Sequence, residues 1–274
     1  MPTMNAPLTL GISPCPNDTF IFDAWINGRL SQDAPAVDTR LEDIETLNRL
    51  ALQSALDVVK VSFFAYIKLR GHYQLLQTGG ALGRGCGPLL VSRSAHLTKQ
   101  DLTNTKLRVA VPGDLTTAHL LLRLYQPATT SILSLPFDQI MPALAQGEID
   151  AGVIIHEGRF TYHHYGLHML VDLGAWWEQT TGHPIPLGCI VARSSLGANT
   201  IESLEHTIHA SLMHARQNPG DSRDYIRSHA QEMDPQVIAQ HIELYVNRFT
   251  ENYGNKGRAA IECLLEQARE ANLL

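Results

Sequence analysis

The chain has 274 residues, a formal net charge of −6, 44% hydrophobic residues and 18% charged residues. This length allows one large domain or two of ordinary size, and the composition is that of a globular protein with ample core. The acidic balance, without any block of basic residues, argues against binding to nucleic acid or to an anionic membrane surface.

The four cysteines lie far apart in the sequence and form no CxxC pair; they are Cys15, Cys86, Cys189 and Cys263. That spacing argues against a zinc site or a disulfide scaffold and is compatible with a reducing compartment. The first residues show neither the basic nor the apolar region of a signal peptide, and no apolar run is long enough to span a membrane. We therefore expect neither export nor insertion into a membrane.

In the first third of the chain, short apolar or alternating runs predict strands, and apolar residues at helical spacing predict helices. The expected strands are residues 8–12, 37–41, 58–62 and 73–77, and the expected helices are residues 19–26, 45–56 and 63–70. The glycine-rich run at residues 79–87 lacks the GxxxxGK[ST] pattern, so it is not interpreted as a phosphate-binding loop.

After a polar connection at residues 99–106, the same alternation of strands and helices starts again. The expected strands are residues 107–111, 131–135, 151–155, 167–173 and 187–192, and the expected helices are residues 118–125 and 137–145. Further helices are expected at residues 201–217, 221–229, 235–245 and 256–271. Pro219-Gly220 and Asp234-Pro235 punctuate this helical part of the chain.

The two halves of this pattern are similar in plan. Residues 8–14 resemble residues 107–112, and residues 54–59 resemble residues 147–152. We therefore predict an α/β protein with a two-lobed, type II periplasmic-binding-protein-like fold and a ligand cleft between the lobes. Lobe 1 is expected to comprise residues 1–92 and 190–274, and lobe 2 residues 93–189.

His156, Glu157, Gly158 and Arg159 directly follow the buried strand expected at residues 151–155. In open α/β sheets, ligands bind in the crevice beyond the carboxyl ends of the strands. A histidine at that place is a candidate proton carrier. A structural histidine, hydrogen-bonded at a strand end, explains the same position equally well.

Other polar residues are expected at the same kind of place. Lys60 lies inside a buried strand, so it either points into a wet cleft or pairs with a carboxylate. Ser62 ends that strand and could donate to a ligand oxygen or to the local backbone. Thr116 and Thr117 lie where a helix begins, which favours an anion such as a carboxylate, or a simple N-cap, and the two roles can coexist.

Four segments together resemble the 1,4-dihydroxy-6-naphthoate synthases of the futalosine route to menaquinone. They are SPCPNDTF at residues 13–20, Lys-Val-Ser at residues 60–62, GDLTTA at residues 113–118 and IHEGR at residues 155–159. The resemblance covers essentially the whole chain. The first and last segments are specific, and the other two are supportive only in that context.

The resemblance implies a cytoplasmic lyase that needs no metal or organic cofactor. Its reaction converts cyclic dehypoxanthinyl futalosine to 1,4-dihydroxy-6-naphthoate and releases dihydroxyacetone. The catalytic base of the family maps onto His156. The substrate contacts map onto Lys60, Val61 and Ser62 and onto Thr116 and Thr117, and Asn17 of the first segment is a further expected contact. The expected partner is a small molecule that carries a carboxylate.

Three alternatives are weighed against this function. A small-carboxylate solute-binding protein fits the fold, but it would need an export signal. A chorismate-dehydratase-like enzyme shares the plan, but that family lacks the SPCPNDTF and HEGR segments. An effector-sensing module of a regulator would need a helix-turn-helix before the first strand. Homodimerisation through the C-terminal helices is left open.

Overall fold

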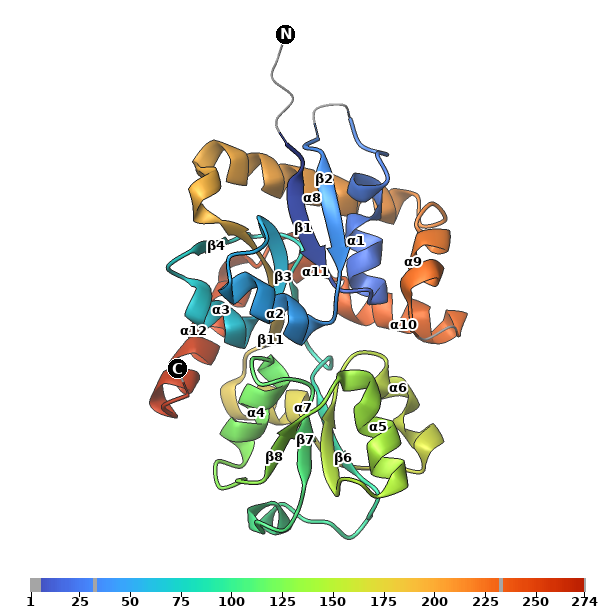
Figure 1. The fold of residues 1–274 in the computed structure, drawn as a ribbon, viewed down its shortest axis with the longest axis vertical. Helices are drawn as coiled ribbons and strands as arrows, with labels where there is room; N and C mark the ends of the chain where they lie inside the picture. Colours follow the sequence, from blue (N-terminus) through green and yellow to red (C-terminus); the bar gives the residue numbers. More distant parts are fainter. Residues whose placement is uncertain (1–5, 32–33, 232–233, 274) are drawn as a thin grey trace. The chain divides into compact units, whose positions relative to one another are not determined.

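The computed structural model describes residues 6–31, 34–231 and 234–273, and Figure 1 shows their helices and strands. The chain forms two compact units, each built from segments that are distant in the sequence. Unit 1 contains the chain up to Val61, Lys68–Ala81 and Gly188–Tyr253. Unit 2 contains Ser62–Ile67, Leu82–Leu187 and Gly254–Leu274. Within the described segments, no helix combines the length and apolar character that crossing a bilayer requires.

The sheet of unit 1 has a core of three parallel strands. Its order is β2 (Val37–Leu41), β1 (Leu8–Ile12), β3 (Val58–Ser62), β11 (Ile185–Arg193) and β4 (Tyr73–Leu75). β1 pairs in parallel with β2 and β3, and β11 pairs antiparallel with β4. Because β1 and β3 are parallel, the residues that follow them lie at the same edge of the sheet.

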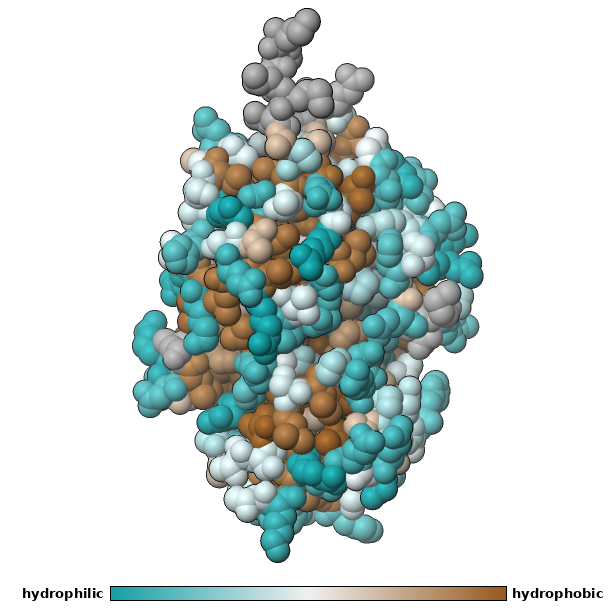
Figure 2. All heavy atoms as spheres, viewed as in Figure 1, coloured by the Kyte–Doolittle hydropathy of each residue, from teal (hydrophilic) through white to brown (hydrophobic). Residues whose placement is uncertain are grey.

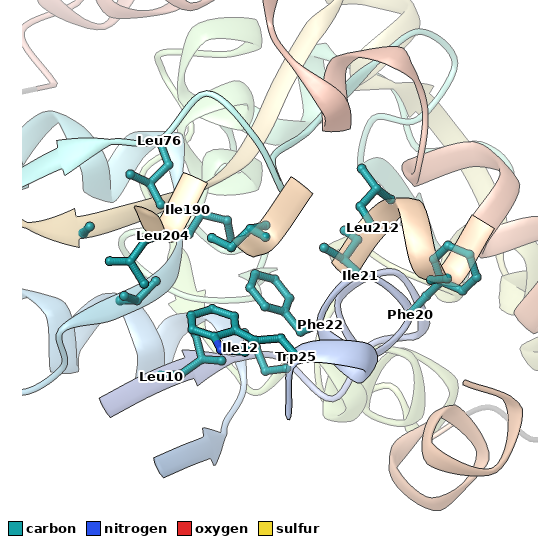
Figure 3. Close-up of a cluster of buried hydrophobic side chains, with 14 of the residues drawn as sticks. Leu10, Ile12, Phe20, Ile21, Phe22, Trp25, Leu76, Ile190, Leu204 and Leu212 are labelled. Carbon is teal, nitrogen blue, oxygen red and sulfur yellow. The ribbon is translucent and has the colours of Figure 1, made fainter. Parts of the chain in front are cut away.

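The core of unit 1 surrounds α1 (Pro16–Ile26), which is buried along almost its whole length. α8 (Ala198–Gln217), α9 (Arg223–His229) and α10 (Pro235–Tyr245) pack against it. The Ser211 hydroxyl donates to the Ile21 carbonyl at 2.6 Å and thereby ties α8 to α1. Figure 3 shows side chains of β1, α1, α8 and β11 gathered in this cluster. Because α1 is covered by its neighbours, its polar residues are buried as well, and Asn17, Asp18 and Asp23 each have a hydrogen-bond partner.

The sheet of unit 2 has the order β10 (His168–Asp172), β6 (Leu89–Ser92), β9 (Ala151–Ile154), β7 (Val109–Val111) and β8 (Ile132–Ser134). β7 pairs in parallel with β8 and β9, and β6 pairs antiparallel with β9 and β10. Figure 1 shows α4 (Thr117–Tyr125) and α5 (Phe137–Gln146) on opposite sides of these strands. A Cβ on Gly152 would lie 2.5 Å from Cγ2 of Ile140, so this glycine allows α5 to pack closely on β9.

Shorter elements complete the two units. They are α2 (Ile44–Leu52), α3 (Phe63–Leu69), β5 (Ala81–Gly83), η1 (Gln100–Thr103), α6 (Gly158–Thr161), η2 (Tyr162–Tyr165), α7 (Leu173–Thr181), η3 (Ser194–Leu196), α11 (Arg248–Glu251) and α12 (Gly254–Glu270). On the face shown in Figure 2, hydrophilic residues are interspersed with hydrophobic ones, as expected of an ordinary protein surface.

The two sheets repeat one plan, as the sequence predicts. The order β2-β1-β3 of unit 1 corresponds to the order β8-β7-β9 of unit 2, with the first strand of each half in the centre. β1 and β7 are the strands of the first similar pair of segments, and β3 and β9 those of the second. The predicted α/β class, with two similar halves, is confirmed by this topology.

Several bounds differ from those expected. α1 begins at Pro16 rather than residue 19, because proline suits the first turn of a helix. α2 ends at Leu52 rather than residue 56, because Ser54 adopts the left-handed backbone conformation. The units also divide the chain differently from the expected lobes. β6 and α12 belong to unit 2, where β6 pairs with β9 and α12 contacts α4.

Candidate functional site

His156 follows β9 with a backbone conformation that side chains other than glycine seldom adopt. Its φ is +55°, in the left-handed region, between the strand and the short helix α6. Histidine visits this region more readily than most residues, but the conformation still costs on the order of 1 kcal/mol or more. Such strain persists only where the surroundings impose it, and it gathers at functional sites. The backbone at His156 therefore supports a functional role over a simple structural one.

The imidazole of His156 is half-buried and packs against an aromatic ring. The His156 and Phe137 rings have centroids 5.1 Å apart and meet edge to face. The Arg159 amide donates to the His156 carbonyl at 3.3 Å, which closes the first turn after the strand. The chemistry available here is proton transfer by a group whose ordinary pKa is near neutral.

Arg159 ties this turn to two neighbouring strands of the sheet. Its guanidinium donates to the Gly87 carbonyl at 2.8 Å and to Oδ2 of Asp172 at 2.5 Å. Gly87 precedes β6, and Asp172 ends β10 and caps α7 through the Ala175 amide. The sequence places Arg159 in the motif but gives no indication of these partners.

Lys60 pairs with a carboxylate, which is one of the two outcomes expected for it. Its ammonium donates to Oδ1 of Asp18 at 2.6 Å, and both side chains are buried. The Ser13 hydroxyl donates to the other carboxylate oxygen at 2.7 Å. A Cβ on Gly188 would approach Cε of Lys60 to 3.1 Å, so this glycine leaves room for the lysine stem. Asp18 is therefore the residue that links the SPCPNDTF segment to β3.

Both ends of the Asn17 amide are engaged by protein groups. The Asn17 nitrogen donates to Oδ1 of Asp18 at 2.8 Å, and its oxygen lies 2.9 Å from Nε2 of His241. His241 is fully buried on α10. Asn17 thus helps to hold Asp18, and this network connects α10 with the edge of the sheet where β1 and β3 end.

Thr116 and Thr117 use their hydroxyl protons within unit 2. Thr116 caps α4 by accepting from the His119 amide at 3.2 Å, and it donates to the Gly113 carbonyl at 2.8 Å. Thr117 donates to the Leu187 carbonyl at 2.7 Å and accepts from the Phe64 amide. The N-cap expected at this place is therefore present. Neither hydroxyl retains a proton that it could donate to a ligand carboxylate.

The predicted site residues fall into two groups. In unit 1, Asn17 and Lys60 meet through Asp18, with Val61 next in the same strand and also buried. In unit 2, the threonine pair follows β7 and His156 follows β9, and these strands are parallel, so both lie at one edge of the sheet. Buried Ser62 ends β3 at the start of α3. The sequence did not single out Asp18, Phe137, Asp172 or His241.

The two fully enclosed cysteines are held as neutral thiols. Burial, with a smaller contribution from the charge of Glu178, raises the pKa of Cys86 to about 12. Burial also raises the pKa of Cys189 well above its ordinary value. These two thiols are poor nucleophiles, because the thiolate is the reactive form.

Comparison with known proteins identifies the family. Residues 8–270 match the sequence model of the family described as Menaquinone biosynthesis. The 1,4-dihydroxy-6-naphthoate synthase of Thermus thermophilus is 47% identical over 97% of this chain and 95% of the relative. The synthase of the same name from Streptomyces coelicolor is 48% identical over 97% of this chain and 94% of the relative.

The solved structures agree with the fold. Protein AF1704 from Archaeoglobus fulgidus is 33% identical with a TM-score of 0.90, and the match covers 98% of both chains. The alkanesulfonate-binding protein SsuA from Xanthomonas axonopodis is 13% identical with a TM-score of 0.74, covering 98% of this chain and 94% of the other. The second likeness supports the binding-protein fold alone. From the family match and the two synthases, the chain is an enzyme that belongs to the menaquinone-biosynthesis family.

Proposed function

We propose that the protein converts cyclic dehypoxanthinyl futalosine to 1,4-dihydroxy-6-naphthoate with release of dihydroxyacetone. The observation that carries the proposal is the identity of nearly half the residues with two proteins named for this product, over almost their whole lengths. The left-handed backbone at His156, in the IHEGR segment, adds a local reason to assign the base there. A cytoplasmic location is part of the proposal.

In the proposed reaction, His156 removes an acidic proton from the substrate, which has a ring carbonyl next to a spiro carbon. The resulting enolate allows a carbon–carbon bond to break, and formation of the aromatic naphthalene diol drives the reaction forward. The proton held by the imidazole can return to the dihydroxyacetone fragment, so no co-reactant is required. A single positioned base typically contributes about 10²–10⁴-fold to the rate.

The substrate carboxylate is assigned to the N-terminus of α4. The first amides of a helix have no acceptor within the helix, and the helix dipole favours an anion there. Because Thr116 and Thr117 use their hydroxyl protons on backbone carbonyls, the proposed donors are the amides of Thr117 and Ala118. The threonines contribute by fixing the position of this helix end.

Lys60, Val61 and Ser62 are proposed to supply the remaining substrate contacts. The Lys60 ammonium carries three protons, and its bond to Asp18 uses one of them. A second proton can be donated to a substrate oxygen on which charge develops, and such donors stabilise enolates. Asn17 is proposed to act through Asp18 rather than by touching the substrate, because its amide bonds Asp18 and lies against His241.

The alternative function is that of a binding protein for a small carboxylate. The test is to incubate the purified protein with cyclic dehypoxanthinyl futalosine, without added cofactor and with a chelator, and to measure naphthoate and dihydroxyacetone. We expect both products in equal amounts. Tight binding of the substrate without turnover would favour the binding-protein alternative, and activity lost only with the chelator would overturn the expectation that no metal is needed.

A further inference from the structure

We infer that Arg159 is the positioning residue that holds His156 in its left-handed conformation. This inference rests on the proposed role of His156 as the base. Arg159 is three residues beyond His156, and its amide bonds the His156 carbonyl, so the two residues belong to one tight turn. Fixing the Arg159 side chain therefore fixes the turn from which the imidazole projects.

The side chain of Arg159 crosses the ends of three adjacent strands. The register pairs Ile154 of β9 with Leu89 of β6, and Leu89 with Asp172 of β10, so these residues form one row across the sheet. Arg159 itself lies beyond the end of β9. Its guanidinium bonds the Gly87 carbonyl just before β6 and the Asp172 carboxylate at the end of β10. The turn is thus attached to two strands besides its own.

Both acceptors of Arg159 are themselves fixed in place. Asp172 accepts from the Ala175 amide at 2.9 Å as the cap of α7. Gly87 and Gly174 meet backbone to backbone, since a Cβ on Gly87 would lie 2.2 Å from the Cα of Gly174. Because neither acceptor can move freely, the guanidinium transmits the geometry of the sheet to the turn. A strained conformation needs surroundings that impose it, and these two bonds are such surroundings.

Arg108 offers a matched control at the N-terminal end of β9, the end opposite to His156. Arg108 also bonds one carboxylate and one carbonyl, those of Asp150 and Gly147, beside the N-terminal end of β9. It ties the α5–β9 turn in the way that Arg159 ties the β9–α6 turn. Loss of Arg108 therefore removes bonds to the same two kinds of acceptor from the same unit, although its side chain is 45% exposed against 18% for Arg159, and it leaves the contacts of the turn that contains His156 in place.

The experiment compares Arg159→Ala, Arg159→Lys and Asp172→Asn with Arg108→Ala in the full chain. Each variant is measured for kcat, KM, melting temperature and the imidazole NMR signals of His156, which a His156→Asn variant assigns. We expect Arg159→Ala to lower kcat about 10²-fold, the effect of displacing a catalytic group by about 1 Å. KM should change little, Arg159→Lys should recover part of kcat, and added guanidinium should rescue Arg159→Ala. Arg108→Ala should keep kcat near that of the wild type.

The NMR signals give a test that does not depend on the substrate. The His156 signals should shift or broaden in Arg159→Ala and Asp172→Asn and stay in place in Arg108→Ala. Unchanged signals, or a loss of kcat equal to that in Arg108→Ala, would overturn the inference, and a rise in KM alone would make Arg159 a substrate contact instead. If Arg159→Ala does not fold, Asp172→Asn decides, because asparagine can still cap α7. If the wild type is inactive but its His156 signals change in Arg159→Ala, the proposed function is refuted and the positioning role of Arg159 stands.

Discussion

The ammonium of Lys60 lies 2.6 Å from Oδ1 of Asp18, with the two side chains only 5% and 1% exposed. Removal of one partner from such a pair leaves a buried charge without compensation, which typically costs about 3–5 kcal/mol. We expect Lys60→Met and Asp18→Asn each to destabilise the protein by an amount of this order. The double variant should lose clearly less than the sum, as urea unfolding would reveal. Additive losses would mean that the pair is not coupled.

The backbone at His156 predicts a difference between two variants that both lack the imidazole. Asparagine adopts the left-handed conformation of this position readily, whereas alanine adopts it at a cost of roughly 1 kcal/mol. His156→Asn should therefore be more stable than His156→Ala by about that amount, and His156→Gly at least as stable as the asparagine variant. Chemical denaturation of the three proteins tests this order. Equal stability of His156→Ala and His156→Gly would contradict the left-handed conformation.

The two threonines of α4 predict different responses to the loss of their hydroxyls. Thr116→Ala removes an N-cap and should cost about 1 kcal/mol, while Thr116→Ser should cost little. Thr117→Val keeps the shape but leaves the Phe64 amide and the Leu187 carbonyl without their partner, so it should cost about 1–3 kcal/mol. Melting curves of these variants with Thr117→Ser as the control measure both effects. An unchanged melting temperature in Thr117→Val would mean that the Thr117 hydroxyl does not contribute to stability.

Burial of Cys86 predicts a loss of stability in alkaline solution. Its pKa is raised from 9.0 in the unfolded reference to about 12, so above pH 9 the unfolded chain releases a proton that the folded chain retains. The contribution is complete below pH 9 and is lost as the pH rises towards 12. Between pH 8 and pH 10 the wild type should lose about 1 kcal/mol of stability relative to Cys86→Ala. If the stabilities of the two proteins fall in parallel across that range, the pKa of Cys86 is not raised in the folded protein.

The fold was largely predictable because its strands and helices follow simple patterns of apolar residues. β2, β3 and α10 have the bounds that their sequences indicate, and the similarity of segments 54–59 and 147–152 reflects two strands with equivalent places in their sheets. The ends of α1 and α2 differed because proline at the helix start and the left-handed Ser54 decide them. These are local features that apolar periodicity does not record.

The candidate site was predictable in its motifs but not in its contacts. A buried lysine calls for a carboxylate, yet nothing in the sequence identifies Asp18 as the partner of Lys60 rather than one of the seven acidic residues that lie between the two. The partners of Arg159 depend on the antiparallel placement of β6 between β9 and β10, which only the folded sheet defines. Spacing along the chain cannot supply such long-range geometry.

The central claim is that His156 is the base, and the most direct test measures binding and turnover in the same variant. His156→Asn keeps a polar side chain that suits the left-handed backbone, so the site should stay intact. Calorimetry should give substrate binding near that of the wild type, while naphthoate formation should fall by about 10²–10⁴-fold. An asparagine variant that forms naphthoate within about tenfold of the wild-type rate would lie outside that range and contradict the assignment.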